Sequence, residues 1–252
     1  MVKGLDVFRE HFRAYSEQCL LIGGTAGDLA MTEAGDTFRA TKDLDIVLCI
    51  EALDAGFVQA FWEFVRSGGY NRREKAGGQR TYYRFQKPIK ENYPAMLELF
   101  SRRPDILSLV EGSELTPIPI KEEVSSLSAI LLDEGYYDWL CSGAREKDGV
   151  RFVGPEHLIP LKARAWIDLT ERKEQGDSVD SDDIKKHKND VFRLYRIIDP
   201  GFASDIPNKV RDDMDAFIGR MQDESVDLKA LKLGNMEKAD ILAELRRIYC
   251  RS

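Results

Sequence analysis

Residues 20–48 constrain the fold of this 252-residue chain more than any other stretch, because two glycines there precede two aspartates within apolar runs. The run before Gly23 and Gly24 is typical of a short buried strand, and the run that contains Asp43 and Asp45 is typical of a second strand. Successive side chains of a strand point to opposite faces of the sheet. We therefore expect the two carboxylates on one face, roughly 6 to 7 Å apart.

Two carboxylates at that separation repel each other by on the order of 2 to 3 kcal/mol at an effective dielectric constant of about 20. A bound cation offsets this repulsion. Mg²⁺ is usually held by one or two carboxylates together with substrate phosphates. The aspartate pair therefore predicts a magnesium site, and the alternative is an edge strand whose acidic side faces water.

A third acid belongs with this pair. Residues 95–100 form a short apolar stretch that contains one acid, Glu98. A lone carboxylate in such a strand either faces water at a sheet edge or is held by a ligand, since buried carboxylates are rarely left unpaired. Beside Asp43 and Asp45, Glu98 is the candidate third metal ligand.

The glycine turn predicts an anion site. Residues 26–34, which follow it, are compatible with a short helix. A strand that delivers a glycine turn to a helix N-terminus exposes unpaired N–H groups, and the helix dipole favours negative charge there. We expect a triphosphate at this turn. Its candidate contacts are Gly23, Gly24, Thr25 and Lys42.

Composition excludes several other functions. The formal charge of −7 argues against a general nucleic-acid binder, because cationic contacts to phosphates supply most of such affinity. The four cysteines lie far apart without CxxC spacing, and the three histidines are scattered, so any metal should be bound by carboxylates. No apolar run approaches a membrane span, and the N-terminus lacks the apolar core of a signal peptide. We expect a cytoplasmic protein with no membrane partner.

Residues 66–80 carry five Lys or Arg residues between glycines. Such a stretch is usually a solvated loop, and contact with an anionic substrate is the alternative.

The order of elements predicts an α+β protein with two domains, an α/β domain at 1–153 and a helical domain at 154–252. In the first half, hydrophobic periodicity predicts helices and strands that line up in one mixed sheet. The expected helices there are 7–18, 26–34 and 54–67, and the expected strands are 19–24, 42–50, 81–86, 95–100 and 149–153. The second half is almost wholly helical, with helices at 158–173, 182–198, 208–221 and 236–249.

The sequence resembles the polymerase-β-like nucleotidyltransferase superfamily in three motifs, GG at 23–24, DLDIV at 43–47 and MLELF at 96–100. Its signature is an apolar strand, a Gly-Gly or Gly-Ser turn, an Asp-x-Asp pair and a third acid on a later strand. The helical segments PEHLIPLKARAWIDL and DIKKHKNDVFRL are similar to those of AbiEii-type nucleotidyltransferases, found among bacterial toxins and phage-defence proteins. The resemblance covers residues 20–198. One departure is Gly24, where many members have a serine whose hydroxyl meets a phosphate.

The resemblance implies a nucleotidyltransferase-type mixed β-sheet with flanking helices, followed by a C-terminal helical bundle. It implies that Asp43 and Asp45 hold two Mg²⁺ ions, and that Glu98 completes the catalytic metal's shell and helps to deprotonate an acceptor. The reaction would move a nucleoside monophosphate from an NTP to a hydroxyl of RNA, protein or a small molecule. An antitoxin protein would be a partner of a toxin of this type.

Three residues of the helical half are further candidates for nucleotide binding. Lys162 would reach the β- or γ-phosphate, and the alternative is a solvated helix lysine. Lys188 and Asp190, in the Lys-x-x-Asp-like segment, are also candidates, and surface ion pairs are the alternative for them.

Two other functions remain open. One is a non-catalytic module that binds a nucleotide or a partner on the same scaffold. The other, a metal-dependent phosphohydrolase, is less favoured because no His-rich ligand set is present.

Overall fold

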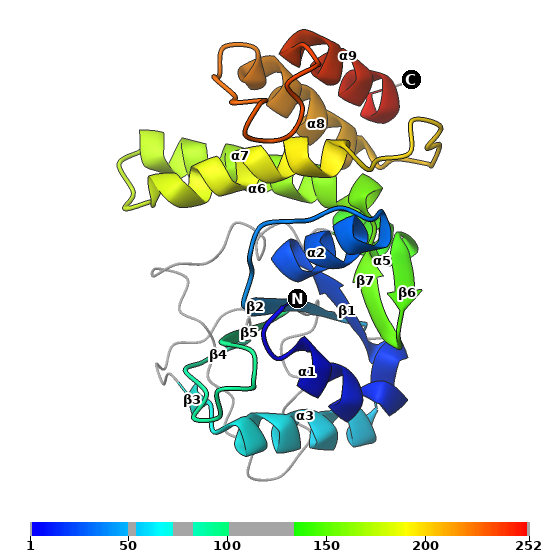
Figure 1. The fold of residues 1–252 in the computed structure, drawn as a ribbon, viewed down its shortest axis with the longest axis vertical. Helices are drawn as coiled ribbons and strands as arrows, with labels where there is room; N and C mark the ends of the chain where they lie inside the picture. The colour runs from blue at the N-terminus through cyan, green and yellow to red at the C-terminus, as the bar shows by residue number, and fades with distance from the viewer. Residues whose placement is uncertain (1, 50–53, 73–82, 101–133, 251–252) are drawn as a thin grey trace. The chain divides into compact units, whose positions relative to one another are not determined.

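The computed structural model describes residues 2–49, 54–72, 83–100 and 134–250, and they fall into two compact units (Figure 1). The first unit contains the described residues up to 100 together with Ala144–Val153. The second contains residues 134–143 and those from Gly154 onward. The expected domains 1–153 and 154–252 stay a prediction, from which these units differ by placing residues 134–143 with the helical part.

The first unit is built on a seven-stranded sheet of order β3-β4-β5-β2-β1-β7-β6. The pairs β2–β5 and β1–β7 are parallel and the other neighbours are antiparallel, so the expected mixed sheet is confirmed. The strands are β1 (Cys19–Ile22), β2 (Asp43–Leu48), β3 (Asn71–Arg72), β4 (Tyr83–Gln86), β5 (Met96–Phe100), β6 (Ala144–Lys147) and β7 (Val150–Val153).

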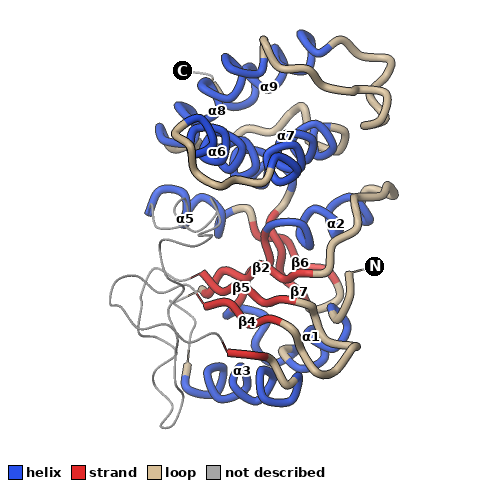
Figure 2. The backbone as a smooth tube through the Cα atoms, turned by 90° about the vertical axis from the view of Figure 1, so that its left-hand side faces the viewer, coloured by secondary structure: helices blue, strands red, loops and turns tan. Residues whose placement is uncertain are grey.

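Helices cover both faces of this sheet, with α1 and α3 on one face and α2 on the other (Figure 1, Figure 2). Their bounds are α1 (Leu5–His11), α2 (Gly23–Glu33) and α3 (Ala55–Gly68). The expected helix 7–18 is wrong in its second half. There α1 ends and a 3₁₀ segment follows at Arg13–Gln18, which Tyr15 interrupts with φ −127° and ψ 22°.

The apolar stripe of α3 packs in the core, as its helical spacing predicts. The ring of Phe12 lies 5.6, 6.3 and 5.3 Å, between centroids, from those of Phe57, Phe61 and Phe64. The helix begins where Asp54 accepts a hydrogen bond from the backbone N–H of Phe57 at 2.8 Å, an N-cap that satisfies a donor left free by helix geometry. This packing holds α3 against the residue that ends α1.

Strand β2 alternates as the sequence predicts. Leu44, Ile46 and Leu48 are at most 1% exposed, whereas Asp43 and Asp45 are partly exposed. Paired residues of neighbouring strands share a face, and Ile46 pairs with Leu21, which lines a small cavity beside α1. The apolar side of β2 therefore faces α1, and its aspartates lie on the α2 side.

The second unit is helical. Gly154 is the N-cap of α6, and Pro155 occupies the first helical position, where the N–H that proline lacks would have no helical partner. The rings of Trp166 and Phe217 meet edge-to-face at 5.4 Å between α6 and α8. The helices are α5 (Glu134–Ser142), α6 (Pro155–Glu174), α7 (Ser181–Tyr195), α8 (Asn208–Met221) and α9 (Lys238–Tyr249).

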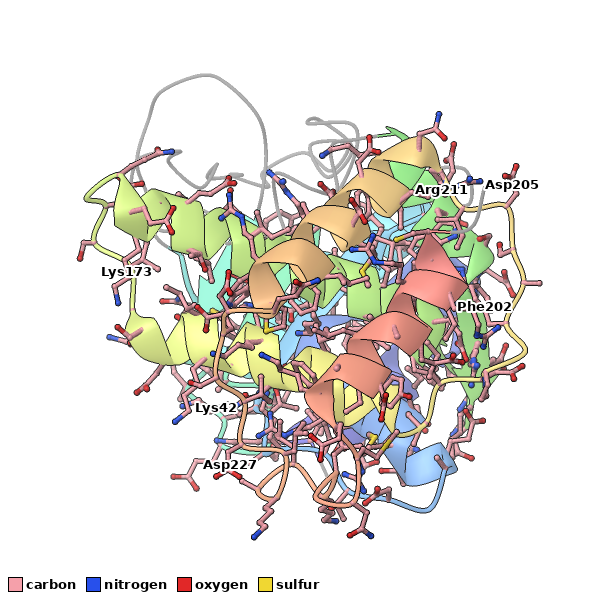
Figure 3. The ribbon with its side chains drawn as sticks, turned by 90° about the horizontal axis from the view of Figure 1, so that it is seen from above. Lys42, Lys173, Phe202, Asp205, Arg211 and Asp227 are labelled. Atoms are coloured by element: carbon pink, nitrogen blue, oxygen red, sulfur yellow. The ribbon has the colours of Figure 1, made fainter. Side chains whose placement is uncertain are left out.

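The turn between α6 and α7 is held by Lys173, which donates a hydrogen bond to the Ser181 hydroxyl (Figure 3). The aromatic side chains of α5 pack in the interior, since Tyr136, Tyr137 and Trp139 are each at most 4% exposed.

A proline lies inside α6. Pro160 has no N–H to donate to the carbonyl of Glu156, four residues earlier, so the normal helical hydrogen bond cannot form there. The buried hydroxyl of Tyr249, in α9, donates to that carbonyl at 2.7 Å. The last helix of the chain thus supplies the partner that the proline removes.

All four cysteines are free thiols. None of the helices in the described part of the chain is long and apolar enough to cross a membrane. In the basic stretch 66–80, Arg66 belongs to α3 and Arg72 to β3, and residues 73–80 lie outside the described residues.

Candidate functional site

The turn from β1 into α2 brings a glycine against an acid. Gly23 has φ +68°, a left-handed conformation that glycine adopts without steric cost. A Cβ atom on Gly23 would overlap the carboxylate of Asp45. The Asp45 side chain therefore lies directly on the first residue of α2, where the helix has unpaired N–H groups.

The third acid lies beside the second. In the parallel pair β2–β5, Asp45 is directly opposite Glu98, and Asp43 is opposite Met96. Opposite residues share a face, and so do residues two apart in a strand, so all three acids lie on the α2 side of the sheet. Glu98 is 5% exposed in a strand with neighbours on both sides, so the sheet-edge interpretation is wrong.

The arrangement has the donors that a hard cation prefers, although it is no preformed cage. Neighbouring strands lie roughly 4.8 Å apart, so the carboxylates on this face of the sheet repel one another. A cation or a hydrogen-bond donor between them offsets this repulsion. Among the residues that the structure describes, no group of three or more His, Cys, Asp or Glu could hold a metal ion by itself. Mg²⁺ needs only one or two carboxylates when substrate phosphates complete its shell. The donor set therefore fits Mg²⁺ that arrives with a nucleotide.

The remaining residues of the predicted phosphate site differ in what they offer. Thr25 is fully buried, and its hydroxyl donates to the backbone carbonyl of Asp43 at 2.8 Å. This hydrogen bond connects α2 to the start of β2. Since the hydroxyl of Thr25 already has a partner, only its backbone N–H could donate to a phosphate. Gly24 lies in the same first turn of α2, and Lys42 is exposed just before β2.

Two side chains that the sequence reasoning missed also lie at this turn. Thr41 Oγ1 and Arg39 Nη2 are 2.8 and 3.2 Å from the position of a Cβ atom on Gly24. The sequence does show an arginine and a threonine just before the strand that carries the two aspartates. Their proximity to α2 depends on how the chain folds back, which local periodicity does not reveal.

Lys162 and Asp190, from the second unit, form a buried ion pair. Lys162 is 1% exposed, and its Nζ lies 3.6 Å from Oδ2 of Asp190. Arg193 donates to the other carboxylate oxygen at 2.9 Å. The solvated-lysine interpretation and the surface-pair interpretation of Asp190 are both wrong, because these charges are in the protein interior. Phosphate binding by Lys162 and Asp190 stays a prediction.

Lys188 forms a different pair. It donates to the Glu224 carboxylate at 2.6 Å and to the Ser225 carbonyl at 3.0 Å, and its side chain is 13% exposed. An ion pair was expected as the alternative to nucleotide binding, and this one joins α7 to the segment after α8. Lys162 and Asp190 are thus brought together, whereas Lys188 pairs with Glu224 and Ser225.

The sequence motifs are therefore gathered in two places. Gly23, Gly24, Thr25, Asp43, Asp45 and Glu98 lie around one turn and two strands of the first unit, and Lys162 and Asp190 pair within the second. The chain matches no protein-family model, no curated protein and no solved structure among those compared with it.

Proposed function

We propose that this protein is a Mg²⁺-dependent nucleotidyltransferase that moves a nucleoside monophosphate from an NTP to a hydroxyl acceptor and releases pyrophosphate. One observation carries the proposal. Asp45 lies opposite Glu98 on one side and against Gly23 on the other. An acidic site for a cation and a helix N-terminus for phosphates therefore share a single turn.

Each group has a distinct role in this proposal. Asp43 and Asp45 would hold Mg²⁺, which when bound neutralises phosphate charge. Glu98 accepts the proton of the acceptor hydroxyl, and the N–H groups of the first turn of α2 donate to the triphosphate. In-line attack at the α-phosphorus needs positioning and charge neutralisation more than a protein nucleophile. The β1–α2–β2 order, with a parallel β5 beside β2, is consistent with a nucleotidyltransferase-type sheet.

The test is an assay with four nucleoside triphosphates, each labelled at the α-phosphorus. The protein is incubated with each one, Mg²⁺ and cell extract, and the product is fractionated into RNA, protein and small molecules. Label on one fraction, with pyrophosphate released in equal amount, is the expected result. Release of orthophosphate with no labelled acceptor would indicate a phosphohydrolase instead.

The second candidate is a non-catalytic module that binds a nucleotide or a partner. The observation that favours it is the lack, among the described residues, of a three-residue group that could hold a metal. It predicts that calorimetry detects binding of Mg·NTP while no acceptor is labelled. Membership of a toxin–antitoxin pair extends the first proposal, and it predicts that expression arrests bacterial growth unless a partner protein is co-expressed.

A further inference from the structure

Residues 38–41 lie along α2, in space that two glycines leave open. The ring of Phe38 lies over Gly27, with carbon atoms 2.8 to 3.2 Å from where a Cβ atom would be. One turn earlier, Thr41 and Arg39 lie over Gly24 in the same way. Any side chain at these helix positions would displace the segment, so the glycines explain how it approaches the helix so closely.

The Arg39 guanidinium is held in place by its own neighbours. It lies 5.3 Å from the centroid of the Phe38 ring, within the range of a cation–π contact. Its Nη1 atom donates to the carbonyl of Ala40 at 3.4 Å, and the side chain is half-buried. Arg39 therefore loses less conformational freedom on binding an anion than a solvated arginine would.

This cation lies close to the acidic site without forming part of it. Asp45 contacts Gly23 and Arg39 lies over Gly24, and the two glycines are neighbours in the chain. Since adjacent Cα atoms are 3.8 Å apart, the Asp45 carboxylate and the nearer Arg39 nitrogen lie within roughly 12 Å of each other. The Arg39 guanidinium is therefore near enough to contact a phosphate group bound at the same turn of α2.

We infer that Arg39 and Thr41 are nucleotide-positioning residues that bind the triphosphate of the substrate. The planar guanidinium suits two hydrogen bonds to phosphate oxygens, and the Thr41 hydroxyl donates a third. Gly24 is glycine because both side chains occupy the space beside its α carbon. This inference rests on the proposed nucleotidyltransferase function, and it assigns that site two ligands from outside the glycine turn.

The test compares the variants R39Q, R39K and T41V with the wild-type chain and with R13Q. Arg13 is 72% exposed on the other side of the sheet, where it pairs with Glu10, so R13Q makes the same charge change away from the site. The measured quantities are KM and kcat for the preferred NTP, and the affinity for inorganic triphosphate with Mg²⁺. Thermal unfolding checks the fold of each variant.

R39Q is expected to raise KM and to weaken triphosphate binding by roughly ten- to a hundredfold, as the loss of hydrogen bonds to a charged group predicts. R39K should recover part of this loss and T41V should raise KM several-fold, while R13Q should change neither quantity. If R39Q unfolds at a much lower temperature than the wild-type chain, the KM and triphosphate affinity of R39K and T41V are compared with those of wild type instead.

Two results would overturn the inference, and they are distinguishable. If the wild-type chain transfers nucleotide and the folded Arg39 and Thr41 variants keep its KM and triphosphate affinity, the inference is wrong and the proposed function stands. If the wild-type chain neither binds nor transfers any NTP, both are wrong.

Discussion

The carboxylate of Asp45 occupies the space into which a side chain on Gly23 would project. This contact joins the aspartate strand to the first turn of α2. Gly23 also has a positive φ of 68°, so two separate constraints require glycine at this position.

A G23A variant should therefore lose more stability than a variant that violates only the backbone constraint. Gly35 is the matched control, because its φ is +73° and nothing lies within 4 Å of its Cβ position. G35A should lower the free energy of unfolding by about 1 to 2 kcal/mol, the cost of a left-handed alanine. G23A should lose this and a further amount for displacing Asp45, measured by urea unfolding. Equal losses in the two variants would contradict the described contact.

A Y249F variant should destabilise the helical unit. It leaves the Glu156 carbonyl, which Pro160 already deprives of a helical partner, buried without its donor from α9. The expected loss in the free energy of unfolding is about 1 to 3 kcal/mol, the cost of a buried unsatisfied acceptor. Tyr195 is partly exposed, so Y195F should stay within about 0.5 kcal/mol of wild type. A Y249F variant as stable as Y195F would rule out this role for the hydroxyl.

Variants of Lys162 and Asp190 separate a folding role from a phosphate role. D190N should cost about 3 to 5 kcal/mol, because it leaves Lys162 buried without its carboxylate. K162M should cost less, since Arg193 still pairs with Asp190. Urea unfolding of both variants and of the double variant gives the coupling energy. A fully stable K162M with a raised KM for NTP would instead indicate that the lysine serves the nucleotide.

Stability should fall at alkaline pH through Cys19. Burial raises the pKa of this thiol from 9.0 in the unfolded chain to about 12. Between those values the unfolded chain releases a proton that the folded protein retains, so stability is fully present below pH 9 and is lost as pH rises toward 12. The loss from this group is on the order of 2 kcal/mol by pH 10.5.

The measurement for Cys19 is the free energy of unfolding of the wild-type chain and of C19A at several pH values between 8 and 10.5. The two curves should converge as pH rises, because C19A lacks the group that titrates. Curves that stay parallel across this range would show that the thiol ionises alike in the folded and unfolded states.

Local patterns in the sequence predict much of the first unit. The alternation from Asp43 to Ile46 predicts which side chains are buried, since that two-residue period separates the two faces of the strand. Val47 departs from it, because it lies on the face of the aspartates and is nevertheless 1% exposed. The β6–β7 hairpin could also have been predicted, but the sequence analysis predicts only its second strand. Asp148 and Gly149 form its turn with φ of +53° and +76°, and an Asp-Gly pair is a common signal for such a turn.

Contacts between segments that are distant in the sequence cannot be predicted from local sequence patterns. The burial of Lys162 depends on Asp190, which lies on another helix, and a helix lysine looks the same in sequence whether it is solvated or paired. The position of Arg39 depends on the close approach of residues 38–41 to Gly24 and Gly27. Similarly, the interior position of Glu98 follows from the order of strands in the sheet.

The most direct test of the proposed function compares the double variant D43A/D45A with D6A/E10A in the labelled-nucleotide assay. Asp6 and Glu10 pair with arginines on the surface of α1, so the control makes the same change in charge away from the site. We predict that D43A/D45A transfers no label while its thermal unfolding shows a folded protein, and that D6A/E10A transfers at the wild-type rate. Transfer by D43A/D45A at the wild-type rate would contradict the assignment of these two aspartates, and with it the proposed mechanism.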